Sequence, residues 1–216
     1  MPLYQTIEIN NRTQILIWKI SEDPAAMESA VSLNPNSLSR VANMKSQQHR
    51  LGFMSVRRLL QHAGYSDFDL IYDHTGKPHL NDGKHISISH SHAFSAIILS
   101  DTTAGIDLEL KRDKIIRIAD KFCDGEFSWL DPANSNDYVA KLTVIWGVKE
   151  AIFKIRNEEG ISFKDHIEVL QFDLHSGVCT AKLNFGGSTI TFDCSFVNVE
   201  DYILVYAFEV TLPIFH

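Results

Sequence analysis

The sequence lacks the features that mark several large classes of protein. Its three cysteines, Cys123, Cys179 and Cys194, include no Cys-x-x-Cys pair, so neither a disulfide framework nor a structural zinc site is indicated. The strongly apolar runs, such as residues 96–99, are far too short to cross a bilayer. The first residues show no basic region followed by an apolar stretch. We therefore expect a soluble protein of the reducing cytoplasm.

Positive charge is also scarce. The 216 residues contain 20 Lys and Arg against 27 Asp and Glu, which gives a net charge of −7. This balance argues against a general nucleic-acid binder whose affinity comes from neutralising phosphates. Any anionic ligand would have to meet a local basic patch. The apolar fraction of 44% is sufficient for a real core, and no fixed-period repeat is present.

The hydrophobic pattern predicts strands and helices in irregular order. Partial alternation predicts one or two strands at residues 3–20, and helical spacing predicts a helix, broken once at most, at residues 35–63. Further strands are expected at 70–72, 85–100, 105–110 and within 167–208, and helices at 115–130 and 138–155. This mixture favours an α+β fold over a doubly wound sheet. Any division into halves is expected near residues 101–104.

Two carboxylates share one face of the predicted strand at residues 105–110. Asp107 and Glu109 alternate with apolar residues, and alternate residues of a strand point the same way. Their hard oxygen atoms suit Mg²⁺ or Mn²⁺. A motif this short is also typical of ordinary surface acids on a half-exposed strand. Both interpretations stay open on the strand alone.

The predicted helix at residues 138–155 carries a third acidic group. Trp146, Glu150 and Lys154 are spaced four residues apart, which places them on nearly one face of a helix. The alternative is an exposed Glu150–Lys154 pair worth only about 0.3–0.5 kcal/mol, with Trp146 filling the core.

Several polar residues earlier in the chain could bind an anion. Ser89 and His90 follow a strand, where hydroxyl, imidazole and backbone N–H groups can bind phosphate. A rival interpretation makes His90 and His92 metal ligands, but the chain is short for the barrel enzymes that use this motif, which have about 250 residues. The turn at residues 76–78 could present an ammonium to a nucleotide or serve geometry alone.

Four motifs occur in one order along the chain. They are Gly76-Lys77-Pro78, Ser87-Ile88-Ser89-His90-Ser91, Gly105-Ile106-Asp107-Leu108-Glu109 and Trp146-Gly147-Val148-Lys149-Glu150-Ala151-Ile152-Phe153-Lys154. This ordered set, from about Arg50 to Ile155, resembles the 4′-phosphopantetheinyl transferase superfamily, in particular its longer, monomeric, surfactin-synthetase-activating type. The resemblance implies a pseudo-twofold α+β fold of two similar halves, each a small antiparallel sheet packed with helices, with the active site in the cleft between them. The halves would be residues 1–104 and 105–216.

The resemblance also implies an activity. Such enzymes move the 4′-phosphopantetheine group of coenzyme A onto a serine of an acyl or peptidyl carrier protein and release adenosine 3′,5′-bisphosphate. Asp107, Glu109 and Glu150 would then be ligands of Mg²⁺, with Mn²⁺ as an alternative. Glu150 and Lys154 would be the catalytic residues, with Glu150 or a metal-bound water as the general base.

The remaining roles concern coenzyme A. By resemblance, Lys154 and His90 would contact the pyrophosphate. Gly76, Lys77 and Pro78 would form the loop on the adenine side, on the residue 1–104 half. Ser89, His90 and Arg50 would face the 3′-phosphate.

The segment after Glu109 is a candidate docking site for the acidic carrier protein. It combines basic residues with apolar ones, a composition suited to steering and docking. The predicted contacts are Lys111, Arg112, Lys114, Ile115, Arg117, Ile118, Lys121 and Phe122. An amphipathic helix that covers the sheet would show the same pattern. Two further functions remain as alternatives: a non-catalytic module that binds coenzyme A or a carrier protein, and a metal-dependent nucleotide pyrophosphate hydrolase.

Overall fold

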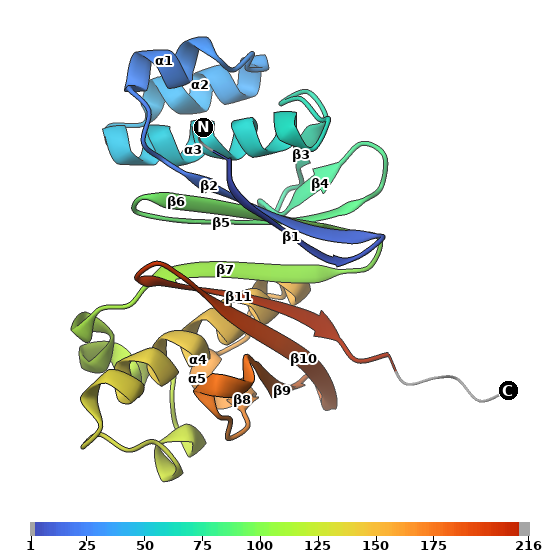
Figure 1. The fold of residues 1–216 in the computed structure, drawn as a ribbon. Coiled ribbons are helices and arrows are strands. Elements are labelled where there is room, and N and C mark those ends of the chain that lie inside the picture. The colour runs from blue at the N-terminus through green and yellow to red at the C-terminus, as the bar shows by residue number, and fades with distance from the viewer. Residues whose placement is uncertain (1–2, 212–216) are drawn as a thin grey trace, which may run out of the picture. The chain divides into compact units, whose positions relative to one another are not determined.

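The chain folds as two compact units, Met1–Thr102 and Thr103–His216, in a computed structural model that describes residues 3–211 (Figure 1). Each unit contains antiparallel strands with helices packed against them, which confirms the predicted α+β class. Within residues 3–211, no helix is both long enough and apolar enough to cross a membrane.

The first unit is built on a four-stranded antiparallel sheet in the order β1-β2-β6-β5. Its strands are β1 (Leu3–Asn10), β2 (Thr13–Lys19), β5 (His85–Ser91) and β6 (Phe94–Ser100). A separate small hairpin pairs β3 (Leu70–Tyr72) with β4 (Pro78–Leu80). Two strands are thus present where one or two were expected at residues 3–20, and the strand region expected at residues 85–100 is the hairpin of β5 and β6.

Three helices belong to this unit: α1 (Pro24–Ser29), α2 (Pro35–Asn43) and α3 (Gln47–His62). The helix expected at residues 35–63 is broken once, because Met44 is extended and Ser46 caps α3 by accepting from the backbone N–H of His49. The apolar face of α3 packs against β2 and β6.

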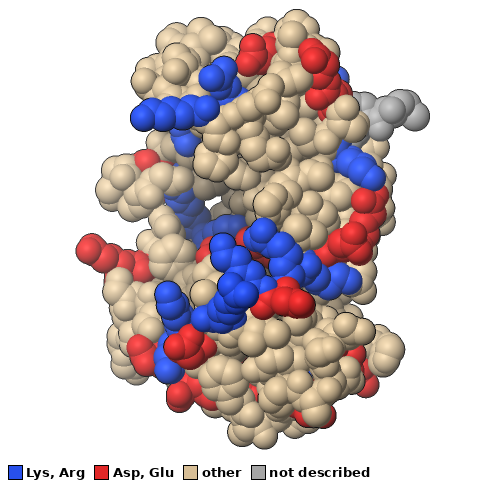
Figure 2. All heavy atoms as spheres, turned by 90° about the vertical axis from the view of Figure 1, so that its left-hand side faces the viewer, with Lys and Arg blue, Asp and Glu red and all other residues tan. Residues whose placement is uncertain are grey.

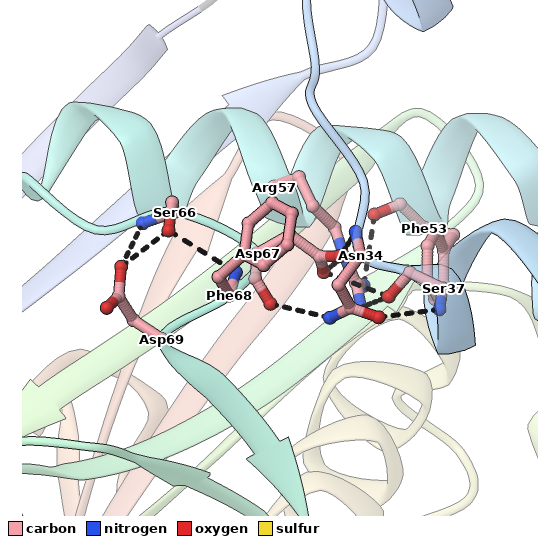
Figure 3. Close-up of polar contacts among 8 residues, drawn as sticks. All are labelled: Asn34, Ser37, Phe53, Arg57, Ser66, Asp67, Phe68 and Asp69. Atoms are coloured by element: carbon pink, nitrogen blue, oxygen red, sulfur yellow. Dashed lines mark hydrogen bonds and ion pairs between the residues drawn. The ribbon is translucent and has the colours of Figure 1, made fainter.

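A buried polar network ties α2 and α3 to the loop before β3 (Figure 3). Arg57 Nε donates to Asp67 Oδ1 at 2.8 Å, and the two side chains are only 2% and 0% exposed. Ser37 Oγ donates to the same carboxylate, and Asn34 both donates to the Asp67 carbonyl and accepts from the Ser37 N–H. Polar groups that lose contact with water need hydrogen-bond partners inside the fold. The network supplies them and so fixes the loop to the helices.

The second unit is built on a five-stranded antiparallel sheet in the order β7-β11-β10-β9-β8. Its strands are β7 (Ala104–Leu110), β8 (Ile167–Val169), β9 (Val178–Phe185), β10 (Ser188–Val199) and β11 (Tyr202–Glu209). The long helix α4 (Ser135–Arg156) packs against β7 and β11, and the short helix α5 (Phe163–His166) lies near β8 and β9. A 3₁₀ helix, η3 (Leu174–Ser176), precedes β9.

The prediction of one helix at residues 115–130 was wrong. This part of the chain forms two short 3₁₀ helices, η1 (Asp113–Lys121) and η2 (Gly125–Ser128). Asp124 leaves the helical region between them, with φ −141° and ψ −84°. The carbonyl of Phe122 accepts from the side chain of Lys149 rather than from a helical N–H. A tertiary contact therefore decides the local structure here.

The Arg57–Asp67 pair yields a stability prediction. Asp67→Ala would leave a buried guanidinium without its carboxylate, so we expect it to lower the free energy of unfolding by about 3–5 kcal/mol. The control is Asp101→Ala, because Asp101 pairs with Arg12 and Lys84 at the surface and should cost less than about 1 kcal/mol. Urea denaturation followed by circular dichroism measures both. Equal effects of the two substitutions would contradict the assignment.

Candidate functional site

Two glycines allow helix α4 to pack closely against strands β7 and β11. A Cβ at Gly105 would lie 2.0 Å from the carbonyl oxygen of Ala151. A Cβ at Gly147 would lie 2.7 Å from Val205 Cγ2 and 3.6 Å from Asp107 Oδ2. Since interiors are close-packed, a larger residue at Gly105 would push the helix backbone away from β7, and one at Gly147 would require the helix or the Val205 side chain to move. Gly105 therefore lets α4 lie directly on the strand that carries Asp107, and Gly147 lets it lie close to the neighbouring strand β11.

This packing brings Lys154 of α4 into contact with Asp107 of β7. Lys154 Nζ donates to Asp107 Oδ1 at 2.8 Å and to the carbonyl of Ile106 at 2.9 Å. The Asp107 side chain is 5% exposed, whereas that of Lys154 is 27% exposed. The ammonium is thus anchored to strand β7, while the Lys154 side chain remains partly exposed to solvent.

The same helix carries Glu150, a carboxyl group whose pKa is raised. Burial and then the negative charge of Asp107, with a smaller effect of Glu109, together raise the pKa of Glu150 to about 7 against the opposing charge of Lys154. Glu150 therefore lies close enough to Asp107 and Glu109 for their charges to shift its pKa. The strand carboxylates and the helix carboxylate thus influence one another electrostatically.

The chemistry of this set of oxygen atoms fits a hard divalent cation, since Mg²⁺ and Mn²⁺ prefer carboxylates. Repulsion between Asp107, Glu109 and Glu150 is the electrostatic condition that a cation relieves. Over residues 3–211, however, no group of three or more His, Cys, Asp or Glu side chains is already arranged as a metal site. The assignment of the three carboxylates as metal ligands stays a prediction.

A pocket of about 200 Å³ lies next to Glu109. Its apolar lining side chains are half-buried, and its Arg and Lys side chains are exposed. The lining residues are Glu109, Leu110, Arg112, Lys114, Ile115, Ile118 and Trp146. Such a combination suits a ligand with an apolar body and negative charge.

Part of the segment predicted to dock a carrier protein lines this pocket, through Arg112, Lys114, Ile115 and Ile118. Arg112, Lys114, Arg117 and Lys121 are exposed, and Ile115 and Ile118 are half-buried. Figure 2 shows Lys and Arg side chains gathered on the side of the second unit that this segment occupies. Phe122, which we had expected among the docking contacts, is 1% exposed and packs edge-on against Trp146 instead. It is therefore a core residue, which corrects that expectation.

The predicted ligand residues of the first unit lie on three elements. Ser89 and His90 are on β5, where Ser89 is buried and His90 is exposed. A Cβ at Gly52 of α3 would lie 3.4 Å from the His90 ring, so the helix and this strand are in contact there. Arg50 is exposed on α3, and its Nε donates to the Met44 carbonyl at 3.0 Å.

The turn of Gly76, Lys77 and Pro78 joins β3 to β4. Gly76 has φ +86°, a conformation that favours glycine. The carboxylate of Asp73 shapes the turn, because it accepts from the N–H of Lys77 at 3.0 Å. Hydrogen bonds from the Thr75 hydroxyl and then from His79 hold the pKa of Asp73 well below its usual range. Sequence reasoning did not single out Asp73, although an Asp three residues before a turn glycine is a common turn signal.

The comparisons with known proteins agree with the motifs. Residues 103–207 match the family model described as the 4′-phosphopantetheinyl transferase superfamily. A curated relative, 4′-phosphopantetheinyl transferase gsp of Aneurinibacillus migulanus, is 28% identical over 120 residues, which cover 53% of this chain and 51% of the relative. The matched part thus spans about half the length of that relative. The resemblance to the superfamily is confirmed, and the family match coincides with the unit that carries Asp107 and Glu150.

Gly105 provides a test of the α4–β7 packing. Gly105→Ala would place a methyl group against the carbonyl of Ala151, so we expect a loss of about 1–3 kcal/mol in the free energy of unfolding. Gly125→Ala is the control, because a Cβ there meets nothing within 4 Å. Thermal and urea denaturation of both variants measure the difference. A Gly105→Ala variant as stable as the Gly125→Ala variant would show that the helix does not need this approach.

Glu150 provides a pH test in the presence of a chelator. Its pKa is raised from 4.5 to about 7 in the folded chain, so between those values the unfolded chain ionises while the folded chain stays protonated. The unfolded state then binds fewer protons, and the free energy of unfolding falls as pH rises from about 4.5 to about 7. Glu150→Gln should remove this part of the decline, as measured by urea denaturation at several pH values. The exposed Glu159→Gln should not, and identical profiles for the two variants would contradict the prediction.

Proposed function

We propose that the protein transfers the 4′-phosphopantetheine group of coenzyme A to a serine of an acyl or peptidyl carrier protein. The observation that carries the proposal is the convergence of Asp107, Glu150 and Lys154 where α4 packs against β7. The superfamily match over residues 103–207 supports the same reaction class, and the relative bears the name of such a transferase.

In this proposal Asp107, Glu109 and Glu150 hold Mg²⁺, or Mn²⁺ in its place. When bound, the ion supplies positive charge that offsets the negative charge growing on the pyrophosphate oxygens. The buried Asp107 side chain favours tight retention of that charge, since electrostatic interactions strengthen away from water.

Lys154 contributes a fixed cation from the protein itself. Its ammonium uses two of its three donor positions on Asp107 and the Ile106 carbonyl. The remaining N–H can donate to a pyrophosphate oxygen of coenzyme A. Because both anchors lie on β7, the ammonium does not need to be ordered again when the substrate binds.

The proton of the carrier serine passes to Glu150 in our account. A carboxylate that also holds a cation is a weaker base, so the proton reaches Glu150 either directly or through a water molecule. The serine oxygen forms a bond to the phosphorus that bears the pantetheine arm. The pyrophosphate P–O bond breaks, and adenosine 3′,5′-bisphosphate leaves with the electron pair.

The first unit would bind the nucleotide end of coenzyme A. The Gly76, Lys77 and Pro78 turn is assigned to the adenine side, and Ser89, His90 and Arg50 to the phosphates. Asp73 supports this role, since its hydrogen bonds fix the turn before any ligand arrives.

The carrier protein would dock on the second unit, over the pocket beside Glu109. The exposed basic residues of η1 can meet an acidic helix, and the half-buried Ile115 and Ile118 can receive its apolar side chains. We further propose that the protein acts in the cytoplasm as a monomer.

The direct test incubates the protein with coenzyme A, Mg²⁺ and apo carrier proteins of the fatty-acid, polyketide and peptide classes. We expect a mass gain of one phosphopantetheine group on the carrier serine. Glu150→Gln should lower the transfer rate by about 10²-fold or more, while Glu159→Gln should leave it unchanged.

The other outcomes discriminate between functions. Coenzyme A binding without turnover under any metal would indicate a non-catalytic module. Consumption of coenzyme A without a carrier would indicate a pyrophosphate hydrolase. Either result, with no mass gain on any carrier, would overturn the proposal.

A further inference from the structure

A second lysine of α4, Lys149, is completely buried. Its side chain is 0% exposed, and its Nζ lies 2.6 Å from Glu126 Oε1, whose side chain is 2% exposed. Nζ also donates to the carbonyls of Phe122 at 2.6 Å and Phe163 at 3.0 Å. An ammonium has three donor positions, and all three are occupied. Lys149 is therefore unable to act as a cation for a substrate, in contrast to Lys154.

Glu126 extends these contacts further. Its Oε2 accepts from the N–H of Asp124 at 3.0 Å, and its Oε1 accepts from the N–H of Val169 at 3.1 Å. The ion pair thus joins α4 to the loop between η1 and η2 and to β8. Burying two charges is costly unless hydrogen bonds satisfy them, and here the bonds are made to backbone groups of irregular segments. Apolar residues of similar volume would give the fold a similar free energy of unfolding. The ion pair differs from them because its hydrogen bonds fix the position of the backbone.

The fixed backbone leads directly to the proposed docking segment. Phe122 ends η1, and its carbonyl is held by Lys149. The ring of Phe122 packs edge-on against Trp146, with centroids 5.1 Å apart, and Trp146 also lines the pocket beside Glu109. η1 is a 3₁₀ helix, and the hydrogen bonding of this helix type is weak over a run of nine residues. The segment needs an external anchor, and Lys149 supplies it at the C-terminal end.

We propose that Lys149 and Glu126 are positioning residues for carrier recognition: their buried ion pair sets the place of η1 and hence of the basic wall of the pocket. This inference rests on the proposed function and deepens it. The pair acts on the carrier through η1, so its loss affects carrier recognition more than coenzyme A binding or chemistry. Misplacement of a binding element by about 1 Å is enough for large kinetic effects.

The test compares the wild-type protein with the double variant Lys149→Met/Glu126→Gln. This variant removes both charges together and keeps a side-chain oxygen for the N–H groups of Asp124 and Val169. We expect KM for the carrier protein to rise about tenfold, with KM for coenzyme A unchanged. Amide hydrogen exchange should become faster in residues 113–122 and stay the same in α4.

Arg117→Glu is the matched comparison. Arg117 is exposed on η1, so reversing its charge should raise KM for the carrier without altering exchange in residues 113–122. If the double variant does not fold, Glu126→Asp takes its place, because it keeps the charge and shortens the reach by one methylene group.

Two results would overturn the inference. One is unchanged exchange in residues 113–122, which is measured without any carrier and so does not depend on transferase activity. The other is a folded variant in which KM for the carrier is unchanged, or in which kcat falls alone. A wild-type protein that modifies no carrier would instead overturn the proposed function, and the exchange measurement would still decide whether the ion pair positions η1.

Discussion

The close approach of helix α4 to strand β7 is the constraint on which the rest of the site depends. A side chain at Gly105 would overlap the backbone of Ala151, and one at Gly147 would crowd Val205. Without these two glycines the helix would stand further from the sheet, and Lys154 would not reach Asp107 at 2.8 Å. The charged groups are thus positioned by the absence of side chains next to them. This accounts for the occurrence of a glycine in both motifs that carry the carboxylates.

The same helix places two lysines in different surroundings, one buried and one partly exposed. Lys149 lies in the interior, where its three donors are used by Glu126 and two carbonyls. The Lys154 side chain is partly exposed instead. The difference follows from their positions on the helix: Lys149 faces η2 and α5, whereas Lys154 faces Ile106 and Asp107 of β7. One lysine fixes structure, and the other is available for a ligand.

Much of this arrangement could be predicted from the sequence, because it follows from local periodicity. Alternation placed Asp107 and Glu109 on one face, and helical spacing placed Glu150 near Lys154. The 3₁₀ helices at residues 113–128 could not be predicted in this way, since the Phe122 carbonyl is bound by Lys149, which lies far along the chain. The burial of Phe122 and Lys149 likewise depends on packing between distant segments. A pattern of single residues does not show which charges are enclosed by the fold.

The central claim is that the three carboxylates form one divalent-cation site. Electron paramagnetic resonance of Mn²⁺ titrated into the protein, with coenzyme A present, tests it most directly. The account predicts one bound Mn²⁺ per chain and an affinity lowered by about tenfold or more in Asp107→Asn, whereas Asp101→Asn leaves the affinity unchanged. Binding of equal strength in the two variants would contradict the account.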